Sequence, residues 1–279
     1  MSPSLPVQQQ PRVIPAAAPE TTPLNDLGEV LSPSQVRTFR DCGARWYFKY
    51  ALGLPDPPNG SLVRGRVVHQ MAETFFRAKL AGATPDSDDL QATFEEAWDV
   101  ASAGAAFGAD EDVDLLKRQA AVLTRKYLDE VAPEIQPAAV ELPIQGTITR
   151  VKVRGFIDLL DTRGRIIDLK TAARKPTGVS ADYAFQLATY RQLCSGANGS
   201  ARVDTLVATK TPQVVTQEYS VSVADLKMTE KLYPLVRESM REGIYLPNRT
   251  SNLCSYNHCA FAATCEAEFG GRVKGGEEE

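Results

Sequence analysis

Two acidic residues and a lysine lie on neighbouring predicted strands in the segment 154–171. Apolar, β-branched stretches flank a glycine-containing turn, which predicts two antiparallel strands. If the turn has the three residues 162–164, Asp158 lies directly across from Asp168. Lys170 is two residues further on, so we expect it to project from the same face as Asp168.

Carboxylates that face each other on adjacent strands repel, and β-sheets normally avoid this arrangement. A divalent cation between them would make it favourable, and hard oxygen ligands suit Mg²⁺ or Mn²⁺. Lys170 would then orient the attacking water and stabilise developing negative charge. The alternative is two solvated strand acids and a surface lysine, and the hairpin alone does not distinguish these interpretations.

Helical and strand periodicities alternate along the chain, and Ser32-Pro33-Ser34-Gln35 resembles a helix start with a capping box. The predicted helices cover residues 32–50, 63–80, 90–101, 112–131, 181–194 and 224–243. The predicted strands cover residues 140–144, 151–161, 165–170, 203–209 and 214–221. This order predicts an α/β (α+β) fold with a central mixed β-sheet flanked by helices.

The 279 residues, 43% hydrophobic and 24% charged, have an ordinary globular composition. We expect a disordered Pro-rich arm over 1–27, one domain over 28–268 and a flexible tail over 269–279. No apolar run approaches the roughly 20 residues of a membrane span, and the first residues lack a secretory pattern. We therefore expect an intracellular, cytoplasmic protein with reduced thiols and no membrane partner. The net charge of −4 argues against a general polyanion-binding surface but allows a local basic groove.

The acidic hairpin resembles the core of the PD-(D/E)XK nuclease superfamily, which has a restriction-endonuclease-like fold. Asp158 stands at the first acidic position of that pattern, and Asp168-Leu169-Lys170 matches its acid-x-Lys. RecB-like members carry a histidine on an earlier helix, similar to His69 in Gly65-Arg66-Val67-Val68-His69. They also carry a Gln-x-x-x-Tyr helix, similar to the segment from Gln186 to Tyr190. These motifs occur in the family's order and imply a nuclease core over 63–222.

The resemblance implies a metal-dependent DNA exonuclease that acts on single-stranded DNA or DNA ends. Its implied Mg²⁺ or Mn²⁺ ligands are neutral His69, Asp158, Asp168 and the backbone carbonyl of Leu169. Lys170 is implied as a catalytic residue beside Asp158 and Asp168. Gln186 and Tyr190 are implied to line the nucleic-acid side. Glu73, one turn beyond His69 on the same helix face, either supports the metal ligands from behind or is a solvated acid, and Glu141 is left without an assigned role.

Four of the five cysteines fall into one early and three late positions, Cys42, Cys254, Cys259 and Cys265. Clustered thiols in an intracellular chain usually ligate metal, and spacing alone favours zinc, with His258 as an optional ligand. Cys194 lies outside the pattern and is expected to be a buried, unliganded thiol.

The same cysteine distribution resembles the iron–sulfur RecB-like nucleases, including AddB-type subunits and CRISPR-associated RecB-like exonucleases. That resemblance implies a [4Fe–4S] cluster that joins segments 32–50 and 250–268 of the N- and C-terminal parts. The four residues between Cys254 and Cys259 exceed the two common in that group, which keeps zinc open as the alternative.

Basic residues cluster near the first cysteine and before His69, and Arg45 and Arg66 are candidate DNA contacts. Possible protein partners belong to a repair, phage or CRISPR complex. Two other functions stay open: a non-catalytic DNA-binding scaffold, and a zinc-stabilised interaction protein. The scaffold has no need for paired acids, and the interaction protein leaves the acidic hairpin unexplained.

Overall fold

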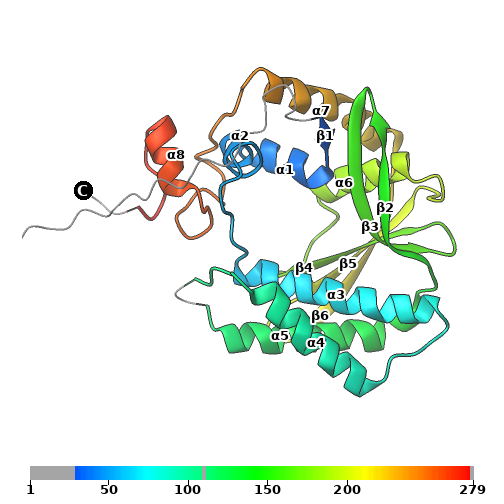
Figure 1. Cartoon of the computed structure of the whole chain (residues 1–279). Helices are drawn as coiled ribbons and strands as arrows, with labels where there is room; N and C mark the ends of the chain where they lie inside the picture. The colour runs from blue at the N-terminus through cyan, green and yellow to red at the C-terminus, as the bar shows by residue number, and fades with distance from the viewer. Residues whose placement is uncertain (1–28, 109–110, 277–279) are drawn as a thin grey trace, which may run out of the picture.

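The computed structural model describes residues 29–108 and 111–276 (Figure 1). The predicted arm 1–27 lies outside these described residues. Within them, no helix combines the length and apolar character needed to cross a membrane.

The centre of the molecule is a six-stranded mixed sheet. Its strands are β1 (Val30–Leu31), β2 (Pro137–Ile148), β3 (Val151–Asp161), β4 (Ile166–Ala172), β5 (Ser200–Val207) and β6 (Gln213–Ser220). Strand pairs β2–β3, β3–β4 and β5–β6 are antiparallel, whereas β1–β3 and β4–β5 are parallel. The predicted mixed sheet is confirmed.

Strand β3 has one open stretch in the middle of the sheet. β2 pairs along its whole length on one edge, so β1 and β4 must share the other edge. β1 pairs with residues 152–153 and β4 pairs with residues 159–160. In the part of the chain that the structure describes, residues 154–158 have no strand partner on that edge, which leaves room for a groove beside Asp158.

Helices cover both faces of the sheet (Figure 1). On one side lie α3 (Gly60–Leu80), α4 (Ser87–Ser102) and α5 (Val113–Glu130), and on the other lie α1 (Pro33–Asp41), α6 (Ala181–Leu193) and α7 (Val223–Arg241). Phe76 of α3 and Leu123 of α5 are buried against Leu169 of β4. On the opposite face, Leu187 of α6 is buried against Ile157 of β3. This two-sided apolar burial fixes α3 and α6 on either side of the hairpin.

The predicted helix 32–50 divides at Cys42. It begins as predicted, because the Ser32 hydroxyl accepts a hydrogen bond from the Gln35 N–H. At Cys42 the backbone is extended, with φ −164° and ψ 109°. A Cβ on Gly43 would lie 2.9 Å from the backbone nitrogen of Leu246, so only glycine allows this close approach. The helical path resumes as α2 (Gly43–Trp46) and a π-helical turn (Tyr47–Ala51).

The C-terminal segment is more structured than the sequence indicated. Helix α8 (Ala262–Phe269) follows a loop that contains two of the late cysteines. Beyond it, Val273 is buried and Lys274 forms a parallel bridge with Ser255. Up to residue 276 this segment lies against the fold with Val273 as a buried apolar anchor, and the last three residues of the predicted flexible tail 269–279 lie outside the described residues.

Candidate active site

The turn between β3 and β4 has the predicted three residues. The Asp161 N–H donates to the Arg165 carbonyl at 3.0 Å, and the Gly164 N–H donates to the Asp161 carbonyl at 2.9 Å. Gly164 adopts φ +77°, the left-handed conformation that glycine enters without a Cβ penalty. The turn thereby sets the register of the whole hairpin.

The hairpin ladder ends just before the two acids. Leu159 pairs with Ile167 as the last paired position, so Asp158 and Asp168 are the next opposed residues. Here a side chain continues the strand pairing: Asp158 Oδ2 accepts a hydrogen bond from the Leu169 N–H at 2.7 Å. The carboxylate of Asp158 therefore lies where the two strands separate.

Asp168 and Lys170 form a close ion pair at this point. Asp168 Oδ2 lies 2.6 Å from Lys170 Nζ, and the Asp168 side chain is only 2% exposed. Asp168 Oδ1 is buried without a hydrogen-bond partner among the described residues. Burial acts to lower the pKa of Lys170, but attraction by Asp168 and Asp158 outweighs it and raises the pKa above its ordinary value. The amine is thus protonated at neutral pH.

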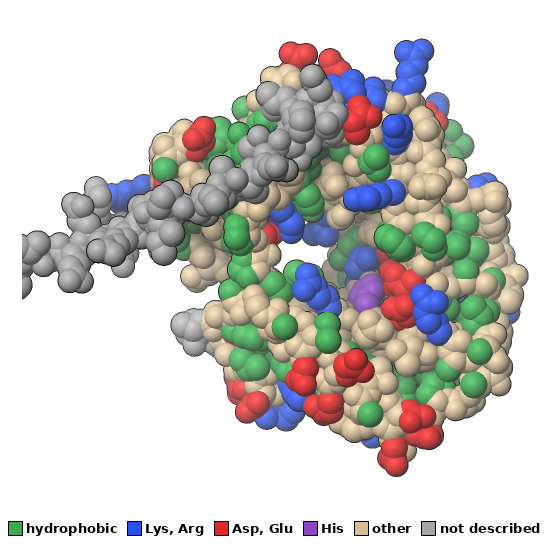
Figure 2. Space-filling view, in the orientation of Figure 1, with side chains coloured by type: hydrophobic (Ala, Val, Ile, Leu, Met, Phe, Trp, Pro, Cys, Tyr) green, Lys and Arg blue, Asp and Glu red, His purple; other side chains and the backbone are tan. Residues whose placement is uncertain are grey.

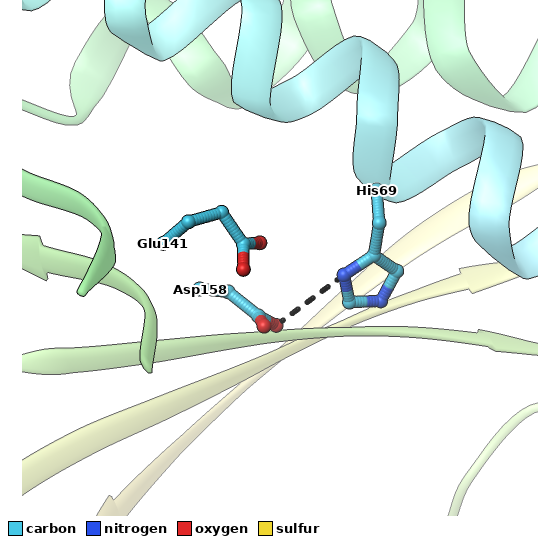
Figure 3. Close-up of side chains that lie close together, drawn as sticks. All are labelled: His69, Glu141 and Asp158. Carbon is cyan, nitrogen blue, oxygen red and sulfur yellow. Dashed lines mark ion pairs between the residues drawn. The ribbon is translucent and has the colours of Figure 1, made fainter. Parts of the chain in front are cut away.

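A three-residue group with metal-ligand chemistry lies beside this pair (Figure 3). One ligand atom each of His69, Glu141 and Asp158 lies within 4.8 Å of the others. His69 Nδ1 is 3.7 Å from Asp158 Oδ2. His69 points from α3 toward the sheet, while the two acids come from β2 and β3. An imidazole and two carboxylates form a donor set that Mn²⁺ or Mg²⁺ can use.

Glu141 is the member of this group to which the sequence assigned no role. The neighbouring pairs Val140–Leu159 and Leu142–Ile157 put Glu141 opposite Asp158. Glu141 has φ +46°, an uncommon conformation for a residue with a side chain. Burial and the nearby Asp158 raise its pKa to about 7, so a cation at this position would relieve a real repulsion. An acid on the strand before the hairpin was the only available signal.

Two of the predicted metal ligands lie outside this three-residue group. Asp168 pairs with Lys170 through Oδ2, and its other carboxylate oxygen, Oδ1, has no hydrogen-bond partner among the described residues and is available as a metal ligand. Leu169 is at the site through its N–H, which binds Asp158. Ligation by Asp168 and by the Leu169 carbonyl stays a prediction.

Hollows extend from the site on two sides. A groove of about 1020 Å³ is lined by Lys170 together with Gln186 and Tyr190, whose side chains share a 2.7 Å hydrogen bond. A second hollow of about 740 Å³ is lined by His69, Glu141 and Asp158 together with the predicted DNA contact Arg66. Figure 2 shows an opening near the centre of the molecule with Lys, Arg and a His side chain at its edge.

Arg45, the other predicted DNA contact, does not join these residues. Its guanidinium lies 3.6 Å from Asp56 and lines a separate pocket that contains cysteines.

That pocket brings together the early and late cysteines of the predicted pattern. It is lined by Cys42, Cys254, Cys259 and Cys265. Their sulfurs are not tightly grouped: within the described ranges, no three of them lie within 4.8 Å of one another. Burial raises the pKa of Cys259 and of Cys265, with partial offsets from Arg45 and Arg249 respectively. Cys194 is buried elsewhere, in the core beneath α6, as predicted.

The comparisons with known proteins agree with the family suggested by the motifs. The family model of the PD-(D/E)XK nuclease superfamily matches residues 30–266. The chain therefore belongs to the PD-(D/E)XK nuclease superfamily. No curated protein shows a significant sequence match to it.

Two solved structures illustrate the shared fold. A protein from Eubacterium rectale, described as "Putative exonuclease", is 13% identical with a TM-score of 0.54. The match covers 92% of this chain and 93% of that one. Because the identity is only 13%, the likeness concerns the fold alone. A protein called SSO0001 is 12% identical with a TM-score of 0.35, and that match covers 84% of this chain and 95% of the other.

Proposed function

We propose that this chain is an Mg²⁺- or Mn²⁺-dependent deoxyribonuclease that removes nucleotides from the ends of single-stranded DNA. One observation carries the proposal: the His69–Glu141–Asp158 group lies directly beside the buried Asp168–Lys170 pair. Glu141 and Asp158 are opposed carboxylates that repel unless a cation neutralises them, whereas Asp168 is already paired with Lys170.

His69, Glu141 and Asp158 would hold the cation, and Asp168 Oδ1 is a further donor at the same site. The cation would neutralise phosphate charge and lower the pKa of a coordinated water. The donor set of hard oxygens with one imidazole fits Mg²⁺ or Mn²⁺, and Mn²⁺ accepts the imidazole more readily.

Lys170 is the protein's own cation at the reacting phosphate. Because its pKa is raised, it would act as a positive charge that orients water and stabilises developing negative charge. Asp168 fixes the amine at 2.6 Å, and the ring of Tyr183 lies 5.2 Å from it. Both contacts restrict the position of the Lys170 amine, as a preorganised site requires.

The hollows on both sides of the site support a nucleic-acid substrate. Gln186 and Tyr190 would contact the strand on the α6 side, and Arg66 would contact a phosphate on the α3 side. The name of the structurally similar E. rectale protein agrees with action on ends, and the RecB-like order of motifs points the same way.

A [4Fe–4S] cluster in the cysteine pocket is the second part of the proposal. The four cysteines line one pocket, and the resemblance of their distribution to the iron–sulfur RecB-like nucleases favours this cluster over zinc. Such a cluster would join Cys42 to the C-terminal segment, and Arg45 and Arg249 would offset its negative charge.

The proposed function is tested with anaerobically purified protein and labelled single-stranded DNA, as linear and as circular molecules. We expect degradation of the linear strand with Mg²⁺ or Mn²⁺, none with EDTA, and a much slower reaction on the circle. Cleavage that EDTA does not stop would contradict the metal site. Equal cleavage of circle and linear strand would contradict the action on ends.

A further inference from the structure

The groove beside Lys170 contains an aromatic side chain that the proposed function has not used. Phe156 lies in the middle of β3, two residues before Asp158. It is 57% exposed, more than any other aromatic side chain in the described ranges. A single exposed apolar residue is common on protein surfaces, so exposure alone indicates nothing about Phe156. Its position in the groove that Lys170 also lines is what suggests a function.

Phe156 lies on a rigid part of the molecule. Its partner across the strand pair is Pro143, and both residues line the 1020 Å³ groove. The neighbouring Gly155 packs so closely under Tyr190 that a Cβ there would lie 3.0 Å from the Tyr190 ring. The backbone that carries Phe156 is thus fixed by its pairing with β2 and its close packing against α6.

Basic side chains line the same groove as the ring. Arg154 precedes it by two residues along β3, and Arg37 of α1 and Lys170 of β4 also line the groove, where Arg37 lies 3.5 Å from Asp182 and Lys170 lies 2.6 Å from Asp168. A groove that combines an exposed ring with basic side chains is the arrangement that proteins use to bind single-stranded nucleic acids, since phosphates contact the cations and a base stacks on the ring. The bases inside a duplex offer no such face, because each is already stacked on its neighbours.

We propose that Phe156 is a stacking platform for one unpaired base next to the scissile phosphate, and that it gives the site its preference for single strands. This inference rests on the proposed function and specifies how that site selects its substrate. Phe156 touches the substrate base rather than the reacting atoms, so its removal should weaken binding of single strands selectively.

The test measures binding without cleavage, in EDTA, of a labelled single strand and of the corresponding blunt duplex. Phe156→Ala should bind the single strand about 10-fold more weakly, within the range of lost base stacking, and should bind the duplex within about twofold of wild type. Phe156→Trp should retain tight binding. Leu235→Ala removes another exposed apolar side chain, on α7, and should change neither.

A series of single strands, each with one abasic site, gives an independent measurement. For wild type, one abasic position should weaken binding about 10-fold, and for Phe156→Ala that position should no longer matter. Equal loss on single strand and duplex, or an abasic effect that persists in Phe156→Ala, would overturn the inference. If wild type binds DNA normally but does not cleave it, the proposed function fails while the stacking result still stands. If wild type binds no DNA, both fail.

Discussion

The carboxylate of Asp158 accepts a hydrogen bond from the backbone N–H of Leu169, with 2.7 Å between Oδ2 and nitrogen. This contact replaces the next rung of the β3–β4 ladder. It fixes the Asp158 carboxylate to the strand that carries Asp168 and Lys170. The site therefore depends on the hairpin as a unit, and changes in the hairpin should affect chemistry as well as stability.

Gly164 tests this dependence from outside the site. Its φ is +77°, and an added Cβ would lie 2.7 Å from the carbonyl oxygen of Gly196. Gly164→Ala should destabilise the protein by about 1–3 kcal/mol, measured by urea unfolding. Activity of the folded fraction should also fall, because the register at Asp158 depends on the turn. A variant with wild-type stability would show that the turn does not control the hairpin.

Glu141 should make the stability of the metal-free protein depend on pH. Burial and Asp158 raise its pKa from 4.5 to about 7 in the folded state. The stability contribution is therefore fully present below about 4.5 and is lost as the pH rises through about 7. Allowing for its partial exposure, the loss is about 1–2 kcal/mol.

Glu141→Gln should remove that part of the pH dependence, as thermal unfolding in EDTA between pH 5 and pH 8 can show. Added Mn²⁺ should raise the Tm of wild type more at pH 8 than at pH 5.5, because the cation needs the charged carboxylate. A Glu141→Gln protein with the wild-type pH profile would exclude Glu141 as the titrating group.

The cysteine pocket should contribute stability rather than catalysis. Cys42→Ala and Cys259→Ala should each lower the Tm by about 10 °C, since losing the group costs several kcal/mol. Cys194→Ala, a buried cysteine outside the pocket, should cost less and keep the metal content. Wild type should contain iron and absorb visible light, whereas a colourless protein with stoichiometric zinc would contradict the cluster.

DNA binding should weaken steeply with salt despite the net charge of −4. If the groove contacts about four phosphates of a single strand, the slope of log K against log salt is about −3. Raising salt from 50 to 200 mM should then weaken binding about 50-fold, and Arg66→Ala should make the slope shallower by about 0.7. DNA binding that salt does not affect would argue against a groove whose basic side chains contact DNA phosphates.

The sequence predicted best those features that depend on residues close together in the chain. Turn residues and alternating apolar residues predicted the register that opposes Asp158 and Asp168, because hairpin geometry follows from turn length. Glu141 lay beyond such reasoning, since its place in the site depends on a left-handed φ within a strand and on pairing between β2 and β3. Arg45 illustrates the same limit: its sequence neighbours suggested DNA, while the fold pairs it with Asp56.

The central claim is that the hairpin acids and Lys170 form the centre of a nuclease. The most direct measurement compares the cleavage of end-labelled single-stranded DNA in Mn²⁺ by wild type, Asp168→Asn, Lys170→Met and Asp114→Asn. Asp114 is an exposed acid in the first turn of α5 and serves as the matched control.

We predict that Asp168→Asn and Lys170→Met lose at least about 100-fold in rate while they remain folded, and that Asp114→Asn cleaves like wild type. Folded Asp168→Asn and Lys170→Met proteins with wild-type cleavage rates would contradict the assignment of this site.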